Sequence, residues 1–204
     1  MESIKDTYRS ISGMSEALFK DRGSKFIARA YPVESEEDVK FYLAELRKEF
    51  YDARHHCYSY VLGANKEVYR INDDGEPSGS AGKPIHGQFL SLDISDVLVV
   101  VIRYFGGTKL GVPGLINAYK TATREALETA DIVIKTIEEE IVIEYDYPLM
   151  NPVMNLIKDE NLKIKETLFE IRCLVKLSVL QSQTDRIKEK ISNIHGIKIQ
   201  KKEE

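Results

Sequence analysis

The sequence lacks the features that would assign it to a secreted, zinc-binding or membrane class. Its 204 residues include two cysteines, Cys57 and Cys173, and neither belongs to a CxxC pair. Such sparse cysteines provide no disulfide framework and no zinc site, and they suit a reducing compartment. The longest strongly apolar run, residues 97–102, is too short for a membrane helix, and the charged first residues do not form a signal peptide. We therefore expect a cytoplasmic protein without membrane contact.

The chain also has no excess of positive charge. Its 29 Lys and Arg residues against 33 Asp and Glu residues give a formal net charge of -4. This balance argues against a protein that coats nucleic acid through bulk charge, so any nucleic-acid site has to be a local patch. The composition, 43% hydrophobic and 30% charged, is typical of a globular protein, and the length allows one large domain or two small ones.

Residues 1–133 have the pattern of a first domain that mixes strands and helices. Residues 96–105 contain the run VLVVVI, which is apolar without alternation and so predicts a central strand buried on both faces. Residues 35–51 show a helical stripe, and Ser35 and Asp38 occupy capping-box positions at its start. The other elements expected here are strands at residues 26–33 and 58–62, a loop over residues 72–82, and helices over residues 85–92 and from Pro113 to about Ala130.

Residues 136–204 are expected to form a second domain with the element order βαββαβ. This order is that of the ferredoxin-like fold, so the whole chain is assigned to the α+β class. No pattern continues across residues 132–135, which predicts two separately cored domains. The open face of such a sheet often contacts RNA or protein. The expected strands span residues 140–145, 162–170, 171–180 and 197–200, and the expected helices span residues 148–160 and the stretch around Ile187 and Ile191.

A glycine-rich stretch, RYFGGTKLGVPGL, begins at Arg103 and joins the buried strand to a helix. Backbone amides and the positive end of the helix would converge there, which favours an anion or nucleic-acid site. Arg103 and Lys109 would add cationic donors. The alternative is that the glycines only make a tight turn. The glycines concerned are Gly106, Gly107, Gly111 and Gly114.

A second loop, NDDGEPSGSAGKPI, is rich in small residues that allow close approach to a ligand or to the loop at Gly106. Asp73, Asp74 and Glu76 have the oxygen ligands that Mg²⁺ prefers, but an acidic turn more often is solvated or caps neighbouring amides. We therefore expect no bound metal and no cofactor. The remaining residues of this adjacent loop are Gly75, Pro77, Gly79, Gly82 and Lys83.

A third stretch, ARHHCYSY, places His55, His56 and Cys57 in a row at the start of a strand. Alternate side chains of a strand point to opposite faces, so His55 and Cys57 share one face and His56 takes the other. This arrangement favours a packed Cys57 and a hydrogen-bonded His56 over metal binding or Cys-His catalysis.

Two long motifs, residues 72–85 and VLVVVIRYFGGTKLGVPGLINAY at residues 97–119, together resemble the YigZ/IMPACT family in its bacterial two-domain form. The resemblance implies an N-terminal domain similar to the second domain of a small-subunit ribosomal protein. It also implies a C-terminal domain similar to the last domain of elongation factor G. Eukaryotic relatives are linked to translational control, through competition for an activator of the kinase that senses uncharged tRNA. The resemblance implies no catalytic residue.

The family pattern also matches positions outside the acidic and glycine residues, and the sequence shows two departures from it. Pro113 stands where the bacterial pattern usually has another Gly, and Asn117 where it usually has Arg. The loop is therefore expected to be stiffer than in relatives, with one cationic donor fewer. The matching supporting residues are His56, Cys57, Tyr104 and Tyr119.

The function expected from these observations is that of a non-enzymatic binding or regulatory protein. It would contact structured RNA, the ribosome or a translation-related protein through the cationic loop from Arg103 to Gly114. One alternative is an enzyme that acts on a phosphorylated metabolite or nucleotide with Mg²⁺. The other is a protein–protein regulator, which would present an exposed patch outside both loops.

Overall fold

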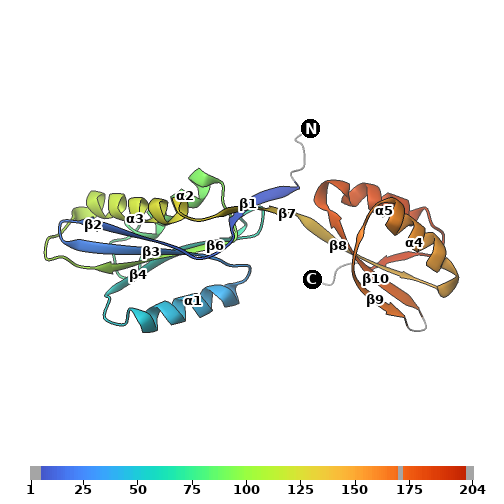
Figure 1. Ribbon diagram of the computed structural model, residues 1–204, viewed down its shortest axis with the longest axis horizontal. Coiled ribbons are helices and arrows are strands. Elements are labelled where there is room, and N and C mark those ends of the chain that lie inside the picture. Colours follow the sequence, from blue (N-terminus) through green and yellow to red (C-terminus); the bar gives the residue numbers. More distant parts are fainter. Residues whose placement is uncertain (1–5, 170–171, 201–204) are drawn as a thin grey trace. The chain divides into compact units, whose positions relative to one another are not determined.

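The computed structural model describes residues 6–169 and 172–200, which form two compact units (Figure 1). The N-terminal unit is Tyr8–Lys135, and the C-terminal unit combines the residues from Thr136 onward with Asp6 and Thr7. The backbone N–H of Ile137 donates to the carbonyl of Asp6 at 2.7 Å, which ties this residue to the C-terminal unit. Asp6 and Thr7 therefore group with the second domain, although residues 1–133 were expected to form the first.

The N-terminal unit is built on a five-stranded sheet. Its strand order is β2-β3-β6-β4-β5, and every neighbouring pair is antiparallel. The sheet thus has β6 at its centre and β2 and β5 at its edges. The strands are β2 (Ser15–Asp21), β3 (Ser24–Pro32), β4 (His55–Leu62), β5 (Val68–Asn72) and β6 (Val97–Tyr104), while β1 (Thr7–Ile11) and β7 (Ile132–Thr136) form a separate two-stranded sheet.

Helices cover both faces of this sheet, with α1 (Glu36–Glu49) on one side and α2 (Gly82–Leu92) and α3 (Gly111–Glu128) on the other (Figure 1). Val99 and Val101 of β6 pack into the core with α2 and α3. Their neighbour Val100 packs into the core with α1. The expectation that VLVVVI forms a central strand buried on both faces is confirmed.

The first helix begins at the capping box expected from the sequence. The Ser35 hydroxyl accepts a hydrogen bond from the Asp38 backbone N–H at 3.1 Å, and the Asp38 carboxylate accepts from the Ser35 N–H at 3.0 Å. Two backbone donors that would otherwise lack partners are satisfied in this way.

Four strands, β1, β2, β5 and β7, are absent from the sequence-based expectation, and β7 runs across residues 132–135, where no pattern was expected to continue. β2 and β5 are edge strands with largely exposed or half-buried residues, so they carry no continuous apolar run. β4 begins at His55 rather than at residue 58, and α2 begins at Gly82 rather than at residue 85. The additional strands complete the antiparallel sheet without changing its expected centre.

The C-terminal unit has the βαββαβ order expected from the sequence, and its sheet order, β11-β8-β10-β9, is that of a ferredoxin-like fold. The α+β assignment is confirmed. Residues 170 and 171, which the two middle strands were expected to include, lie outside the described residues. The elements are β8 (Glu138–Tyr145), α4 (Met150–Asp159), β9 (Lys163–Phe169), β10 (Cys173–Leu180), α5 (Thr184–Ser192) and β11 (Lys198–Gln200).

Within the described ranges, no helix has both the length and the apolar character needed to span a bilayer.

The proposal that the two domains fold independently predicts that a fragment of residues 136–204 unfolds cooperatively. Its core, centred on Val175 and Leu177, consists of residues from this fragment. The fragment lacks the bond from Ile137 to Asp6, so its midpoint should lie below that of the same transition in the full chain. Thermal unfolding followed by circular dichroism tests this. A non-cooperative, protease-sensitive fragment would show that both halves share one folding unit.

Candidate anion-binding site

The acidic loop between β5 and α2 is organised by Asp73. One carboxylate oxygen accepts the backbone N–H groups of Ala81 and Gly82 at 3.0 and 2.8 Å, and the other accepts the N–H of Gly79 at 2.8 Å. Asp73 therefore fills the anion-binding position at the start of α2, where helix amides point outward. The loop's own carboxylate satisfies these donors.

Asp74 connects the same loop to β4 and α1. Its carboxylate accepts the backbone N–H of His56 at 2.6 Å and a guanidinium N–H of Arg47 at 3.1 Å. Its backbone carbonyl lies 2.8 Å from Nδ1 of His55. The turn that follows uses Gly75 at a φ of 88°, a conformation that other residues rarely adopt.

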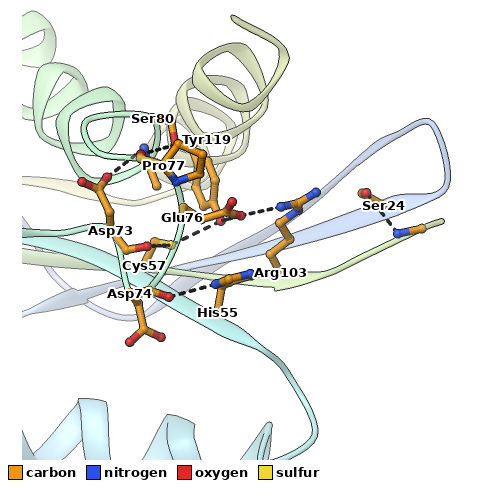
Figure 2. Close-up of polar contacts among 12 residues, drawn as sticks. Ser24, His55, Cys57, Asp73, Asp74, Glu76, Pro77, Ser80, Arg103 and Tyr119 are labelled. Carbon is orange, nitrogen blue, oxygen red and sulfur yellow. Dashed lines mark hydrogen bonds and ion pairs between the residues drawn. The ribbon is translucent and has the colours of Figure 1, made fainter. Parts of the chain in front are cut away.

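Glu76 and Arg103 form a buried ion pair between the two loops (Figure 2). The Arg103 guanidinium donates through Nη1 to Oε1 of Glu76 at 2.6 Å, and the two side chains are only 8% and 4% exposed. The hydroxyl of Tyr119, from α3, donates to the same carboxylate oxygen at 2.8 Å. One carboxylate thus joins the loop, β6 and α3.

Cys57 extends this network toward β4. Its thiol lies 3.2 Å from the Tyr119 hydroxyl and 3.0 Å from the carbonyl of Asp73. Burial raises the pKa of Cys57 to about 12, so the thiol is protonated at neutral pH and is a poor nucleophile. The His56 ring lies on the other face of the sheet, near the backbone of Leu46, and burial lowers its pKa. The arrangement is that of packed side chains, with His56 Nε2 left without a partner within the described residues.

Gly106 makes the closest backbone contact in the glycine-rich loop. A Cβ atom at this position would lie 1.9 Å from the carbonyl carbon of Gly23, in the turn between β2 and β3. The backbone N–H of Gly106 donates to the Ser24 hydroxyl at 3.1 Å. Gly107 and Gly111 have φ values of 89° and 73°. The glycines therefore shape a tight turn, as one of the two sequence interpretations supposed.

Asp73 accepts backbone N–H groups at the start of α2, whereas no side chain among the described residues caps the start of α3. This helix start borders a cavity of about 450 Å³ to which Leu110, Gly111 and Val112 contribute. Both loops meet at this cavity, because Glu76 and Pro77 line it together with the stretch from Arg103 to Leu115. The uncapped amides and the positive helix end favour an anion here.

The cavity lining carries a local excess of positive charge. Arg54, Arg103 and Lys109 are cationic and Glu76 is its one acidic residue. Within residues 6–169 and 172–200, no carboxylate forms an ion pair with Arg54 or Lys109. The Arg103 charge is shared with Glu76. Free positive charge therefore comes from Arg54 and Lys109, in a chain whose net charge is -4.

Comparison with known proteins identifies the family. Residues 22–127 match the model of the Impact N-terminal domain. The chain belongs to the IMPACT family. It is 34% identical to the IMPACT family member YvyE of Bacillus subtilis (strain 168) over 143 residues, which are 70% of this chain and 66% of YvyE. It is 29% identical to the IMPACT family member YigZ of Escherichia coli (strain K12) over 172 residues, 83% of this chain and 84% of YigZ.

A solved structure resembles the whole IMPACT family chain. It is described as the crystal structure of an hypothetical protein, and it matches with a TM-score of 0.75 at 25% sequence identity. The match covers 98% of this chain and 100% of the other. The two-unit architecture is therefore shared with a protein known from crystallography.

Some of the site residues expected from the sequence line the cavity of this IMPACT protein. Arg103, Lys109, Gly111, Glu76 and Pro77 line it. Tyr104 donates to Asp52 at 2.7 Å on the α1 side, and Lys83 is exposed at the start of α2. The other expected residues hold the loops in place or lie beside them, outside the lining: His56, Cys57, Asp73, Asp74, Gly75, Gly79, Gly82, Gly106, Gly107, Gly114 and Tyr119.

Several residues of the lining were not among the site residues expected from the sequence. His55 lines the cavity as the first residue of β4, and Arg54 directly precedes it. Phe105 and Val112 provide apolar walls. The sequence does carry a signal for Phe105. It is the last residue of RYF, directly after a buried strand, where the chain must leave the core and can expose a side chain. No comparable signal indicates Arg54.

The three loop carboxylates do not assemble into a metal site. Among the described residues, no group of three or more His, Cys, Asp or Glu side chains is arranged to hold a metal ion. Asp73 and Asp74 do not line the cavity, and each accepts hydrogen bonds from the protein. Glu76 contributes its carboxylate to Arg103 and Tyr119.

We predict that Gly106→Ala destabilises the N-terminal unit by about 3 kcal/mol or more, because the new methyl group would overlap the Gly23 backbone. Gly87→Ala is the matched control. Nothing lies within 4 Å of a Cβ at Gly87, inside α2, so this change should stabilise by about 0.5–1 kcal/mol. Urea unfolding measures both, and equal midpoints would show that the Gly106 contact is not formed.

We also predict that Glu76→Gln costs about 3 kcal/mol of stability, because it leaves the Arg103 charge buried without its counter-ion. Glu128→Gln is the control. It removes the same charge from an exposed pair with Arg124 on α3, and its unfolding midpoint should barely change. If the two variants lose equal stability, the buried pair has no special role.

Proposed function

We propose that this IMPACT family protein is a non-enzymatic binding protein that contacts phosphate groups of structured RNA in the translation machinery. The observation that carries the proposal is the uncapped start of α3, which opens on a cavity beside two cations without ion-pair partners among the described residues, Arg54 and Lys109. These groups lie in a chain that is acidic overall. Such a patch attracts phosphate locally.

Phosphate suits the donors available at this site. The helix end behaves as roughly half a positive charge, and no side chain in the described part of the protein caps the N–H groups at its start, Gly111 and Val112. Pro113 offers no N–H, so Lys109 and Arg54 have to supply more of the binding than they would at a helix start without proline. A lysine contributes a mobile point charge and an arginine a planar pair of donors.

Membership of the IMPACT family supports RNA, rather than another phosphate-containing ligand, as the binding partner. The YigZ/IMPACT resemblance implies domains similar to those of a ribosomal protein and of elongation factor G, and it links eukaryotic relatives to translational control. Translation takes place in the cytoplasm, which agrees with the compartment inferred from two cysteines that are both free.

The open face of the C-terminal sheet adds little to phosphate binding. Its outward side chains include Lys176 paired with Glu166 at 2.6 Å and Arg172 paired with Glu144 at 2.5 Å. Because acidic and basic groups cancel on this face, the proposal assigns the phosphate contacts to the N-terminal unit.

The two alternative functions have weaker support. A Mg²⁺-dependent enzyme would need free carboxylates at the cavity, but Glu76, the acidic residue there, is bound to Arg103. A protein–protein regulator would need an exposed patch outside both loops. Val68 and Tyr69 on the edge strand β5 are 49% and 56% exposed and provide a small one. A partner that stays bound after nuclease treatment of a lysate would favour this last alternative.

The proposal predicts a salt-dependent affinity for an RNA hairpin, falling by tenfold or more between about 50 and 200 mM salt. Lys109→Ala should weaken binding at low salt and reduce the slope of log affinity against log salt by about one. Lys158→Ala, which removes an exposed cation from α4, is the matched control and should leave both quantities unchanged. Fluorescence anisotropy measures all three proteins. Salt-independent binding, or identical slopes for the two variants, would contradict the proposal.

A further inference from the structure

The cavity beside α3 has an apolar wall that phosphate binding alone does not require. Phe105 is 55% exposed although it follows directly on the buried strand β6, and Leu110, Val112 and Leu115 line the cavity beside it. An exposed aromatic ring next to cations is the combination that binds unpaired nucleotides, because every base has a flat face that stacks on such a ring.

The ring of Phe105 is held in place from one side. The guanidinium carbon of Arg103 lies over it, 5.7 Å from the ring centroid, and 5.4 Å from the ring of Phe26 in the core. Arg103 is fixed in turn by its ion pair with Glu76. A cation on one face leaves the opposite face of the Phe105 ring for another flat group. The platform therefore exists before any ligand binds.

Arg103 is a fixed part of the cavity lining rather than a free donor. Its side chain is more than nine-tenths buried and lines the cavity, yet Nε has no hydrogen-bond partner in the described part of the chain. Nη1 is the guanidinium atom bound to Glu76. Nε is closed off from solvent, so the guanidinium serves the site by fixing Phe105 and Glu76 beside the cavity, and the donors left for a ligand are those of Arg54, Lys109 and the start of α3.

The cavity has the size of a small-molecule site, since its volume of about 450 Å³ falls within the range usual for pockets that enclose a single ligand. Bases inside a duplex are stacked and cannot enter such a space. An unpaired base can swing out and enter it.

We infer that this cavity binds one unpaired nucleotide of RNA, with its base stacked on Phe105 and its phosphate at the start of α3 beside Lys109. The inference rests on the proposed function and specifies the part of the RNA that is recognised. Phe105 then selects single-stranded positions, whereas Lys109 and Arg54 contribute to binding any RNA.

The test compares a blunt-ended RNA hairpin with the same hairpin carrying a single-stranded 3′ extension. The protein should bind the extended hairpin about tenfold more tightly, as expected for one stacked base. Phe105→Ala should remove this preference, so that the extended and the blunt hairpin bind the variant equally tightly. Phe41→Ala, which removes a similarly exposed phenylalanine (61%) from α1, is the matched control and should keep the preference. Phe105→Leu keeps apolar bulk without an aromatic face, and should also lose the preference.

The possible outcomes separate the inference from the function on which it rests. If neither hairpin binds, the proposed function fails. If both bind equally and Phe105→Ala changes neither affinity, RNA binding stands and the inference is overturned. Equal weakening of both hairpins by Phe105→Ala, in a variant with an unchanged unfolding midpoint, also overturns it. The remaining measurement is the affinity of the protein for adenosine monophosphate. If it binds as tightly as the extended hairpin, the cavity takes free nucleotides and the RNA assignment is wrong.

Discussion

Two opposite charges buried side by side, on Glu76 and Arg103, hold the candidate site together. Each would cost several kcal/mol to bury alone, so the loop that carries Glu76 is fixed against β6 by the pairing itself. Tyr119 brings α3 to the same carboxylate, and Phe105 lies over the guanidinium. Cavity floor, helix start and aromatic wall are thus positioned by one contact. The cost is that Arg103 contributes little free charge.

The parts of the fold that can be predicted from sequence are those whose burial or helix start is evident from the residue pattern itself. The run at Val97 marks the central strand, and Ser35 with Asp38 marks the start of α1. The alternating strands of the C-terminal unit give its βαββαβ order. The edge strands β2 and β5 escape prediction because one side of each pairs with nothing in the sheet, and half-exposed residues there follow no apolar pattern.

The candidate site is only partly predictable for a related reason. The glycines and charged residues of both loops identify them in the sequence as candidate site elements, and the two loops do meet in space. The sequence cannot show that Glu76 neutralises Arg103, because 27 residues separate them and their pairing depends on sheet register. It equally cannot show that Asp73 serves α2 while the start of α3 stays uncapped. A sequence shows which residues are charged, but it does not show which groups those residues bind in the folded protein.

The pairing of β1 with β7 has a consequence for how the chain is put together. Because Asp6 and Thr7 group with the residues after Thr136, the chain enters the unit Tyr8–Lys135 beside the point where it leaves it. The two ends of this unit leave through neighbouring strands, so they are close in space. A unit with adjacent ends can be grafted into a surface loop of another protein without stretching either backbone.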